Sequence, residues 1–275
     1  MKTRYTLALL ALLPILAACK ADDGSSNVTP ATEAASAPAA TPAAATPEAT
    51  PAPADAAAPA TADGQDAAAA SASNAPAPLT GPEPVAGSDY VEIANGQPFQ
   101  PVTGKIEVAE IFGYVCPACA AFQPVLAPWK AGLPGDVNFV YVPAMFGGIW
   151  DNYARAFYAA QTLGVQEKTH EALYAAIHAN GELKGERGTD SVQDIAGWYG
   201  KHGVDAKQFE ATMGSFAVNA KTNAAKQFAQ RSQISGTPSI IVNGRYLVKG
   251  KGWQENLRIA DHLIARERTR RSSGN

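Results

Sequence analysis

The stretch Cys116-Pro117-Ala118-Cys119 decides how this chain of 275 residues is interpreted. A strand-like apolar run, 106–112, precedes it, and apolar residues with helical spacing follow it. Pro117 suits the first turn of a helix, where no N–H donor is needed, so Cys116 lies at a predicted helix N-terminus that favours a thiolate. Cys119 follows one turn later on the same side, where it can resolve a mixed disulfide formed at Cys116. The pattern therefore predicts a redox-active pair.

Two other uses of the cysteine pair fit the sequence less well. A zinc site needs about four ligands, but the third cysteine is the distant Cys19, and the histidines at 170, 178, 202 and 262 lack the spacing of a zinc finger. A purely structural disulfide between Cys116 and Cys119 would close so short a loop that it would constrain the unfolded chain very little. We therefore expect no metal ion and no cofactor.

The N-terminus predicts export. Lys2 and Arg4 precede an apolar segment, 5–18, that is too short to span a bilayer comfortably. The segment ends in Leu16-Ala17-Ala18-Cys19, which resembles the lipobox of bacterial lipoproteins, whose cysteine is lipidated and becomes the first mature residue. An ordinary signal peptide with an incidental cysteine is the alternative, but its peptidase would meet Leu16 where it needs a small residue. We expect a signal peptide at 1–18, a lipid anchor at Cys19, and an oxidising compartment.

The next segment, 19–87, is predicted to be a disordered linker. It consists mainly of Ala, Pro and Thr, and it has too few large apolar residues to form a core. As a flexible coil it would span roughly 45 Å, and as an extended polyproline helix roughly 200 Å, which suits a tether. Its one lysine and eight acidic residues leave the rest of the chain nearly neutral, so nothing indicates a nucleic-acid partner.

Strand and helix signals alternate through the remainder of the chain. Strand 106–112, a helix to about Lys130 and strand 137–142 form a β-α-β unit. Strand patterns return at 239–242 and 245–248, joined by an Asn-Gly pair typical of a hairpin, and a helix from about 254 to 267 follows. Between these parts the periods are helical, with candidate helices at 150–163, 166–179, 190–201, 205–213 and 215–233. The order predicts an α/β fold in which helices interrupt one sheet.

A longer motif indicates a family. Phe112-Gly113-Tyr114-Val115 before the cysteine pair, together with Gly236-Thr237-Pro238 before a strand, resembles the DsbA family of periplasmic thiol:disulfide oxidoreductases. The resemblance covers most of 88–270, including Phe146-Gly147-Gly148 and 159–164 at the start of the helical region. It implies a thioredoxin fold with an inserted helical domain: 88–148 and 233–275 would form the thioredoxin-like part, and 149–232 the insertion.

The resemblance also implies roles for single residues. Cys116 would be the nucleophile and Cys119 the buried resolving thiol. Pro238 would be a cis-proline facing the disulfide, and the backbone of Thr237 would pair with a substrate peptide as an added strand. Glu110 would be a buried acid that accepts a proton from Cys119. The alternatives are a trans-proline at the start of a strand and a solvated glutamate at a strand edge.

Two positions depart from the family pattern. Many DsbA proteins carry histidine where this chain has Ala118, so we expect the pKa of Cys116 to lie above the value of about 3.5 for DsbA and nearer the value of about 7 for thioredoxin. The chain would then be a weaker oxidant. The family's lysine opposite the buried acid is replaced by Val140, which should leave Glu110 without a cationic partner and raise its pKa.

The other aromatic and histidine residues carry fewer signals. We expect His170 and His178 to be surface or capping residues on helices. Phe112, Phe146 and Trp150 could border a groove for a partner, but we expect them to belong to the core. The helical insertion should have a largely aromatic core, comprising Trp150, Phe157, Tyr158, Trp198, Phe209 and Phe228.

The function predicted from these observations is that of a membrane-anchored periplasmic oxidase. It would introduce disulfides into reduced secreted proteins and be reoxidised by a DsbB-like membrane partner, as the family resemblance implies. A reductase or isomerase kept reduced by a DsbD-like partner is the first alternative, and Ala118 leaves room for it. A lipoprotein that binds peptides without redox chemistry is the second alternative. It predicts that Cys116→Ser leaves function intact.

Overall fold

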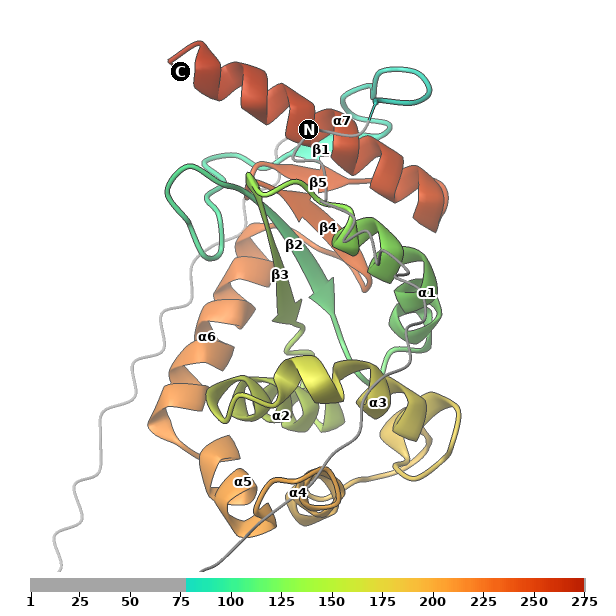
Figure 1. Cartoon of the computed structure of the whole chain (residues 1–275), viewed down its shortest axis with the longest axis vertical. Helices are drawn as coiled ribbons and strands as arrows, with labels where there is room; N and C mark the ends of the chain where they lie inside the picture. Colours follow the sequence, from blue (N-terminus) through green and yellow to red (C-terminus); the bar gives the residue numbers. More distant parts are fainter. Residues whose placement is uncertain (1–77, 275) are drawn as a thin grey trace, which may run out of the picture. The chain divides into compact units, whose positions relative to one another are not determined.

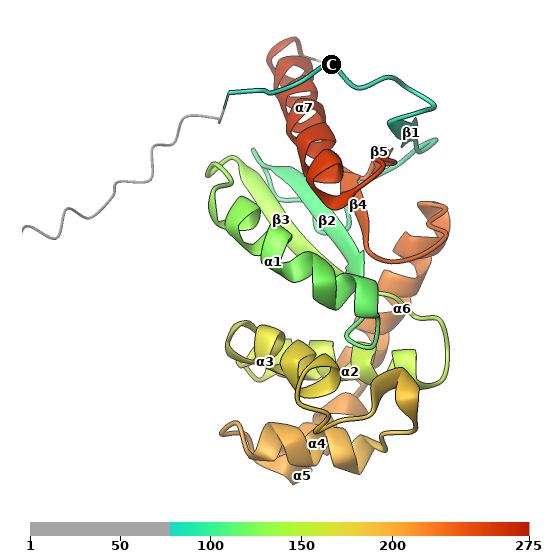
Figure 2. The same ribbon diagram turned by 90° about the vertical axis from the view of Figure 1, so that its right-hand side faces the viewer.

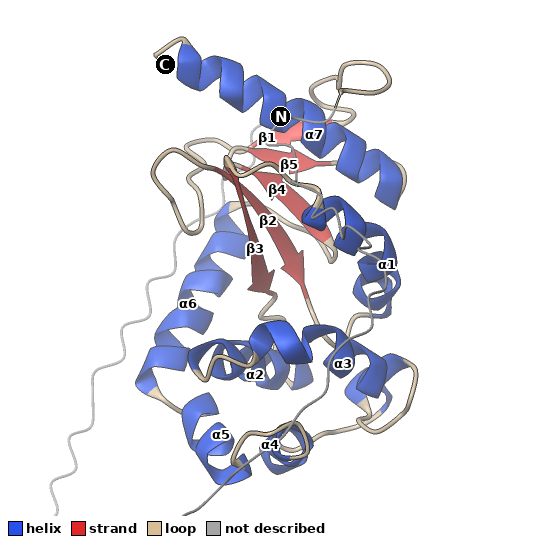
Figure 3. Cartoon of the chain, in the orientation of Figure 1, coloured by secondary structure: helices blue, strands red, loops and turns tan. Residues whose placement is uncertain are grey.

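The computed structural model describes residues 78–274, so the signal peptide, Cys19 and most of the predicted linker lie outside the described part. The described chain folds into one mixed sheet and a set of helices, shown in Figures 1 and 3. The strands are β1 (Tyr90–Glu92), β2 (Ile106–Phe112), β3 (Val137–Pro143), β4 (Ser239–Val242) and β5 (Tyr246–Val248). The helices are α1 (Pro117–Ala131), α2 (Ile149–Thr162), α3 (Gln166–His178), η1 (Gly185–Arg187, a 3-10 turn), α4 (Val192–Gly200), α5 (Ala206–Met213), α6 (Phe216–Arg231) and α7 (Trp253–Ser272).

Strand β2 forms the centre of the sheet, whose order is β1-β5-β4-β2-β3. It pairs in parallel with β3 and antiparallel with β4, and all seven of its residues are buried. A strand covered on both faces is mostly apolar, and β2 is apolar except for the buried Glu107 and Glu110, which is why the sequence predicted it. Figure 2 shows α1 and α7 on one face of the sheet and α6 on the other. The cysteine motif therefore follows directly from the most buried strand.

The insertion, α2 to α6, lies between β3 and β4 in the chain and beyond the ends of these strands in space (Figure 2). Its apolar residues join those of β2 in one continuous core. Helix α4 begins with a capping box in which the Ser191 hydroxyl accepts from the Asp194 N–H (3.0 Å). Asn243 and Gly244 both have positive φ at the centre of the turn between β4 and β5, which the Arg245 N–H closes on the Val242 carbonyl oxygen (2.9 Å). The predicted α/β fold with an inserted helical region is confirmed.

Three details of the sequence prediction were wrong. Strand β1 was not predicted, because its three residues form a strand only by pairing with β5. Helix α7 begins at Trp253 and extends to Ser272, five residues beyond the predicted end at 267. The predicted linker, 19–87, also ends too late, because its last ten residues, 78–87, belong to the described fold.

Residues 78–87 run along α7, where they are held mostly through their backbone. The Nε2–H of His262 donates to the carbonyl oxygen of Thr80 (2.9 Å), and Arg258 donates to that of Pro82. Arg266 forms an ion pair with Glu83 (2.8 Å). Composition predicted no apolar burial here, but it cannot show that carbonyl oxygens will accept hydrogen bonds from a distant helix. Within 78–274, no helix is both long enough and apolar enough to cross a membrane.

Candidate active site

Cys116 is the N-cap residue of α1. Its backbone is extended (φ −77°, ψ 115°), and its Sγ accepts a hydrogen bond from the N–H of Cys119 (3.3 Å). Pro117 occupies the first helical position. Both cysteines are free thiols, but Cys116 retains 6% of its exposed surface and Cys119 none. Cys116 is therefore the sulfur of the pair that a second protein can reach.

The two thiols have opposite acidities. Hydrogen bonds from the Cys119 side chain, from Thr237 and from the N–H groups of Cys119 and Ala118 lower the pKa of Cys116 to about 6, although burial acts in the opposite direction. Burial, together with Cys116 and Glu110, raises the pKa of Cys119. At neutral pH the pair therefore holds one thiolate, at Cys116, and one thiol. The pKa of Cys116 lies above the value of about 3.5 for DsbA, in the direction expected from Ala118.

Thr237 and Pro238 lie beside Cys116 because β4 pairs with β2. The register places Ser239 opposite Ile111, so the residues just before β4 come next to the start of α1. The Thr237–Pro238 peptide bond is cis. The Cys116 thiol donates to the carbonyl oxygen of Thr237 (3.6 Å). Residues 121 positions apart in the chain thus form one surface around the sulfur.

Glu110 lies beneath the cysteines on β2, with no exposed surface. Burial raises its pKa to about 8, while the nearby Gln123 amide and the Lys130 charge act to lower it. Neither carboxylate oxygen has a partner within hydrogen-bonding geometry among the described residues. The alternative of a solvated residue at a strand edge is therefore wrong, and a proton on Glu110 is available near Cys119 at neutral pH.

The neighbour of Glu110 on β3 is Tyr141 rather than Val140, which pairs with Ala109. The Lys130 ammonium, near the end of α1, donates to the Tyr141 hydroxyl (2.9 Å) and lies over its ring, 4.7 Å from the centroid. Glu110 has no cationic partner on the paired strand and its pKa is raised, as expected, but the sequence did not indicate that Lys130 on α1 lies close enough to act on the carboxyl. Glu110 still has no ion pair in the described range. Which residue of β3 lies beside Glu110 depends on the strand register, which the sequence does not show.

The prediction that His170 is a surface or capping residue was wrong, while His178 is half-buried in the last turn of α3. His170 is only 3% exposed, and its Nδ1 hydrogen-bonds to the Tyr114 hydroxyl (2.8 Å). Burial lowers the pKa of His170 to about 3, so its ring is neutral. The Nε2–H of the half-buried His178 donates to the carbonyl oxygen of Tyr114 (2.7 Å). A sequence signal existed, because His170, Leu173, Tyr174 and Ile177 form the buried stripe of α3 at helical spacing.

The aromatic residues separate into two groups. Phe112 is fully buried, as are the predicted core aromatics of the insertion other than Trp150. Phe146, by contrast, is 51% exposed, and its ring lies 4.9 Å from that of the half-buried Trp150. Core packing was therefore the wrong interpretation for Phe146, whereas Trp150 is partly buried and packs against the core. The Trp150 ring also contacts the loop before Cys116, since a Cβ on Gly113 would lie 2.2 Å from Cζ3 of Trp150.

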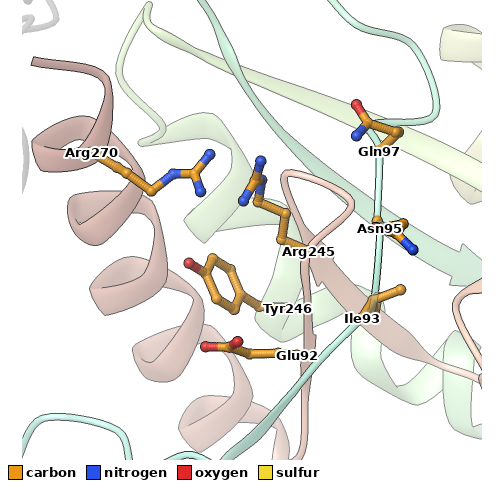
Figure 4. A pocket seen from close by; sticks show the side chains of 8 residues that line it. Glu92, Ile93, Asn95, Gln97, Arg245, Tyr246 and Arg270 are labelled. Atoms are coloured by element: carbon orange, nitrogen blue, oxygen red, sulfur yellow. The ribbon is translucent and has the colours of Figure 1, made fainter. Parts of the chain in front are cut away.

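A separate pocket of about 410 Å³ lies at the β1–β5 side of the sheet, against α7 (Figure 4). The guanidinium groups of Arg245 and Arg270 point toward one another there, with Tyr246 and Glu92 nearby. Neither cysteine lines this pocket. We therefore assign the redox chemistry to the surface around Cys116.

The fold and this site define the class of protein. A thiolate caps the first helix after the central strand, a buried thiol lies one turn deeper, and a cis X-Pro bond flanks the sulfur. This combination on a thioredoxin-like sheet is that of a thiol:disulfide oxidoreductase.

Comparison with known proteins agrees with this class. Residues 151–261 match the family described as DSBA-like thioredoxin domain. The thiol:disulfide interchange protein DsbA of Pseudomonas syringae pv. tomato is 43% identical over 182 residues, which cover 65% of this chain and 82% of that protein. The crystal structure of oxidoreductase DsbA from Xylella fastidiosa superposes with a TM-score of 0.66 at 46% identity and covers 68% of this chain and 98% of that one. Pseudomonas aeruginosa DsbA gives a TM-score of 0.62 at 37% identity, over 68% of this chain and 96% of its own. The chain belongs to the DsbA family.

Proposed function

We propose that this protein is a periplasmic oxidase, anchored to the membrane through a lipid on Cys19, that introduces disulfides into reduced secreted proteins. The observation that carries the proposal is the opposite acidity of the two thiols, with the thiolate placed at the accessible end of α1. A stabilised Cys116 thiolate favours the reduced form of the pair. The oxidised form therefore accepts electrons from substrate thiols readily.

The proposed reaction begins with the disulfide between Cys116 and Cys119. A substrate thiolate attacks Sγ of Cys116, the bond between the two cysteines breaks, and Cys119 leaves as a thiolate. A second substrate thiolate then attacks the substrate sulfur of the mixed disulfide and expels the Cys116 thiolate, a good leaving group because its pKa is low. The substrate loses two electrons and gains a disulfide, while the cysteine pair gains the same two electrons.

Glu110 supplies the proton that this sequence requires. Cys119 is buried and its pKa is raised, so it must be protonated once it leaves as a thiolate. Glu110 holds a proton at neutral pH because its own pKa is about 8. We assign it the transfer of that proton to Cys119, and the uptake of a proton when the pair is reoxidised by a DsbB-like membrane partner.

Thr237 and Pro238 are assigned to substrate binding. The Thr237 carbonyl oxygen lies next to the Cys116 sulfur, at the start of a segment that leads into β4. An extended substrate peptide could pair with this backbone, which would give affinity through main-chain hydrogen bonds and little dependence on sequence. The exposed Phe146 and the neighbouring Trp150, whose ring lies beside Gly113 in the loop before Cys116, offer an apolar surface near the same sulfur.

A reductase or isomerase kept reduced by a DsbD-like partner is the second candidate. The observation that favours it is the pKa of Cys116, about 6, which stabilises the thiolate less than the value of about 3.5 in DsbA. A less stabilised thiolate makes the disulfide a weaker oxidant.

The redox state of the pair in living cells tests the proposal. Thiols are trapped by acid and then alkylated with a reagent that changes the mass of the chain, and Cys116→Ser serves as the reference for a chain that cannot form the disulfide. A mostly oxidised pair supports the oxidase. A mostly reduced pair supports the second candidate and contradicts the proposal. If Cys116→Ser still supports disulfide formation in secreted proteins, redox-independent peptide binding becomes the better explanation.

A further inference from the structure

Each of the three residues before Cys116 is held by the helical insertion. The Trp150 ring of α2 occupies the space beside Gly113, where a Cβ would lie 2.2 Å from Cζ3. Val115 is 1% exposed and lies next to Gly185 of η1. Tyr114, between them, is held by α3. The loop that carries the nucleophile is therefore shaped by helices that lie outside the sheet.

Tyr114 is bound at both of its ends. Its hydroxyl hydrogen-bonds to Nδ1 of His170 (2.8 Å), and its carbonyl oxygen accepts from Nε2–H of His178 (2.7 Å). The two histidines are eight residues apart on α3, about two turns, so they lie on one side of the helix. Tyr114 is only 1% exposed, so a lost partner would not be replaced by bulk water at no cost.

These contacts bear on the thiolate through the backbone. The N–H of Cys116 donates to the carbonyl oxygen of Gly113 (3.1 Å), which closes a turn around Tyr114. The orientation of this turn decides whether Cys116 Sγ points at the N–H of Cys119. The hydrogen bond between them makes Cys116 the N-cap of α1.

Direct charge effects do not explain a role for the histidines. The titratable groups that interact with Cys116 or Cys119 include the two cysteines themselves, Glu110 on β2 and Tyr174 on α3, and neither histidine is among the main causes of the shift of either thiol. The hydrogen bonds of His170 and His178 lead to Tyr114 and not to either sulfur. Their influence on Cys116 must therefore pass through the position of the loop.

We propose that His170 and His178 are positioning residues that fix the turn at 113–116 through Tyr114 and thereby stabilise the Cys116 thiolate. The inference rests on the proposed role of Cys116 as the nucleophile. It gives the helical insertion a part in setting the redox properties of the site, and not only in packing against the sheet.

The experiment measures two quantities in the purified reduced chain: the pKa of Cys116, from the ultraviolet absorbance of its thiolate, and the equilibrium constant of the cysteine pair with glutathione. The variants are His178→Ala, His178→Gln, which keeps a donor near the position of Nε2, and Tyr114→Phe, which removes only the hydroxyl that His170 binds. His202→Ala is the matched control, because His202 also hydrogen-bonds to a carbonyl oxygen in the insertion, that of Trp198 (2.9 Å), but does not contact the loop.

We expect His178→Ala and Tyr114→Phe each to raise the pKa of Cys116 by about half a unit or more, since a lost hydrogen bond is worth about 1 kcal/mol and one pKa unit about 1.4 kcal/mol. The equilibrium with glutathione should shift at least about twofold toward the oxidised pair. His178→Gln should restore most of both changes, and His202→Ala should cause neither.

Unchanged pKa and equilibrium constant in His178→Ala and Tyr114→Phe, whatever the loss of stability, would overturn the inference. Tyr114→Phe keeps the ring and so decides the matter if His178→Ala does not fold. The proposed function fails separately, if the wild-type chain itself shows no thiolate at Cys116 near neutral pH or if its cysteine pair is mostly reduced in living cells.

Discussion

Replacing Glu110 by glutamine should make the protein more stable in alkaline solution. The side chain has no exposed surface, and burial raises its pKa from 4.5 to about 8. Below pH 4.5 the carboxyl is protonated in both the native and the unfolded chain. Between pH 4.5 and about 8 the unfolded chain releases the proton and the native chain keeps it, so the free energy of unfolding falls as pH rises. The loss is complete once the pH has passed the native pKa.

The size of this loss follows from the shift in pKa. At about 1.4 kcal/mol per pKa unit, a rise from 4.5 to about 8 corresponds to about 5 kcal/mol. Glutamine has no proton to release, so Glu110→Gln should match the wild-type stability near pH 4.5 and exceed it by about 3 to 5 kcal/mol at pH 9.

The assay is denaturant unfolding across that pH range, with Cys116→Ser and Cys119→Ser in both chains so that thiol titration does not contribute. Glu92→Gln, at an exposed position on β1, is the control for loss of a carboxylate. Wild-type and Glu110→Gln curves that stay parallel from pH 5 to pH 9 would refute the argument, because they would show that Glu110 titrates alike in the native and unfolded chains.

Three further predictions concern the cysteine motif and its surroundings. The rate of alkylation of Cys116 should reach half its maximum near pH 6, because only the thiolate reacts. Cys119 should stay unmodified, because it is buried and its pKa is raised. A midpoint for Cys116 near that of a free thiol would contradict this prediction. Ala118→His should lower the pKa of Cys116 below 6 and shift the glutathione equilibrium toward the reduced pair, since a nearby imidazolium favours the thiolate; an unchanged thiolate titration would show that position 118 has no such effect. Gly113→Ala should lower the free energy of unfolding by about 1–3 kcal/mol, because the new Cβ would overlap the Trp150 ring. Adding Trp150→Ala should recover part of this loss. Equal stability of Gly113→Ala and wild type in denaturant unfolding would refute the overlap.

The features that could be predicted from the sequence depend on neighbours in the chain. Pro117 after Cys116, the Ser191 cap and the Asn243-Gly244 turn each act within a few residues, so their patterns indicate the local structure directly. The apolar run of β2 indicates a central strand for the same reason. The family motif then connects these local elements into one fold.

The features that could not be predicted depend on contacts between distant residues. The pairing of Glu110 with Tyr141 follows from the register of β2 and β3, and the proximity of Lys130 to Glu110 follows from the packing of α1. The hydrogen bonds of His170 and His178 to Tyr114 connect residues more than fifty positions apart. The buried stripe of α3 would have shown that His170 faces the core, but not which residue it meets there.

The most direct test of the account is the capture of a mixed disulfide. Cys119→Ser removes the resolving thiol, so the purified chain should form a stable disulfide with an unfolded secreted protein whose cysteines carry a small thiol as mixed disulfides. The Cys116 thiolate attacks the protein sulfur and releases the small thiol. We predict that peptide mapping places this bond at Cys116, and that Cys116→Ser under the same conditions forms none. A bond at another residue, or equal capture by the Cys116→Ser variant, would contradict the claim that Cys116 is the nucleophile.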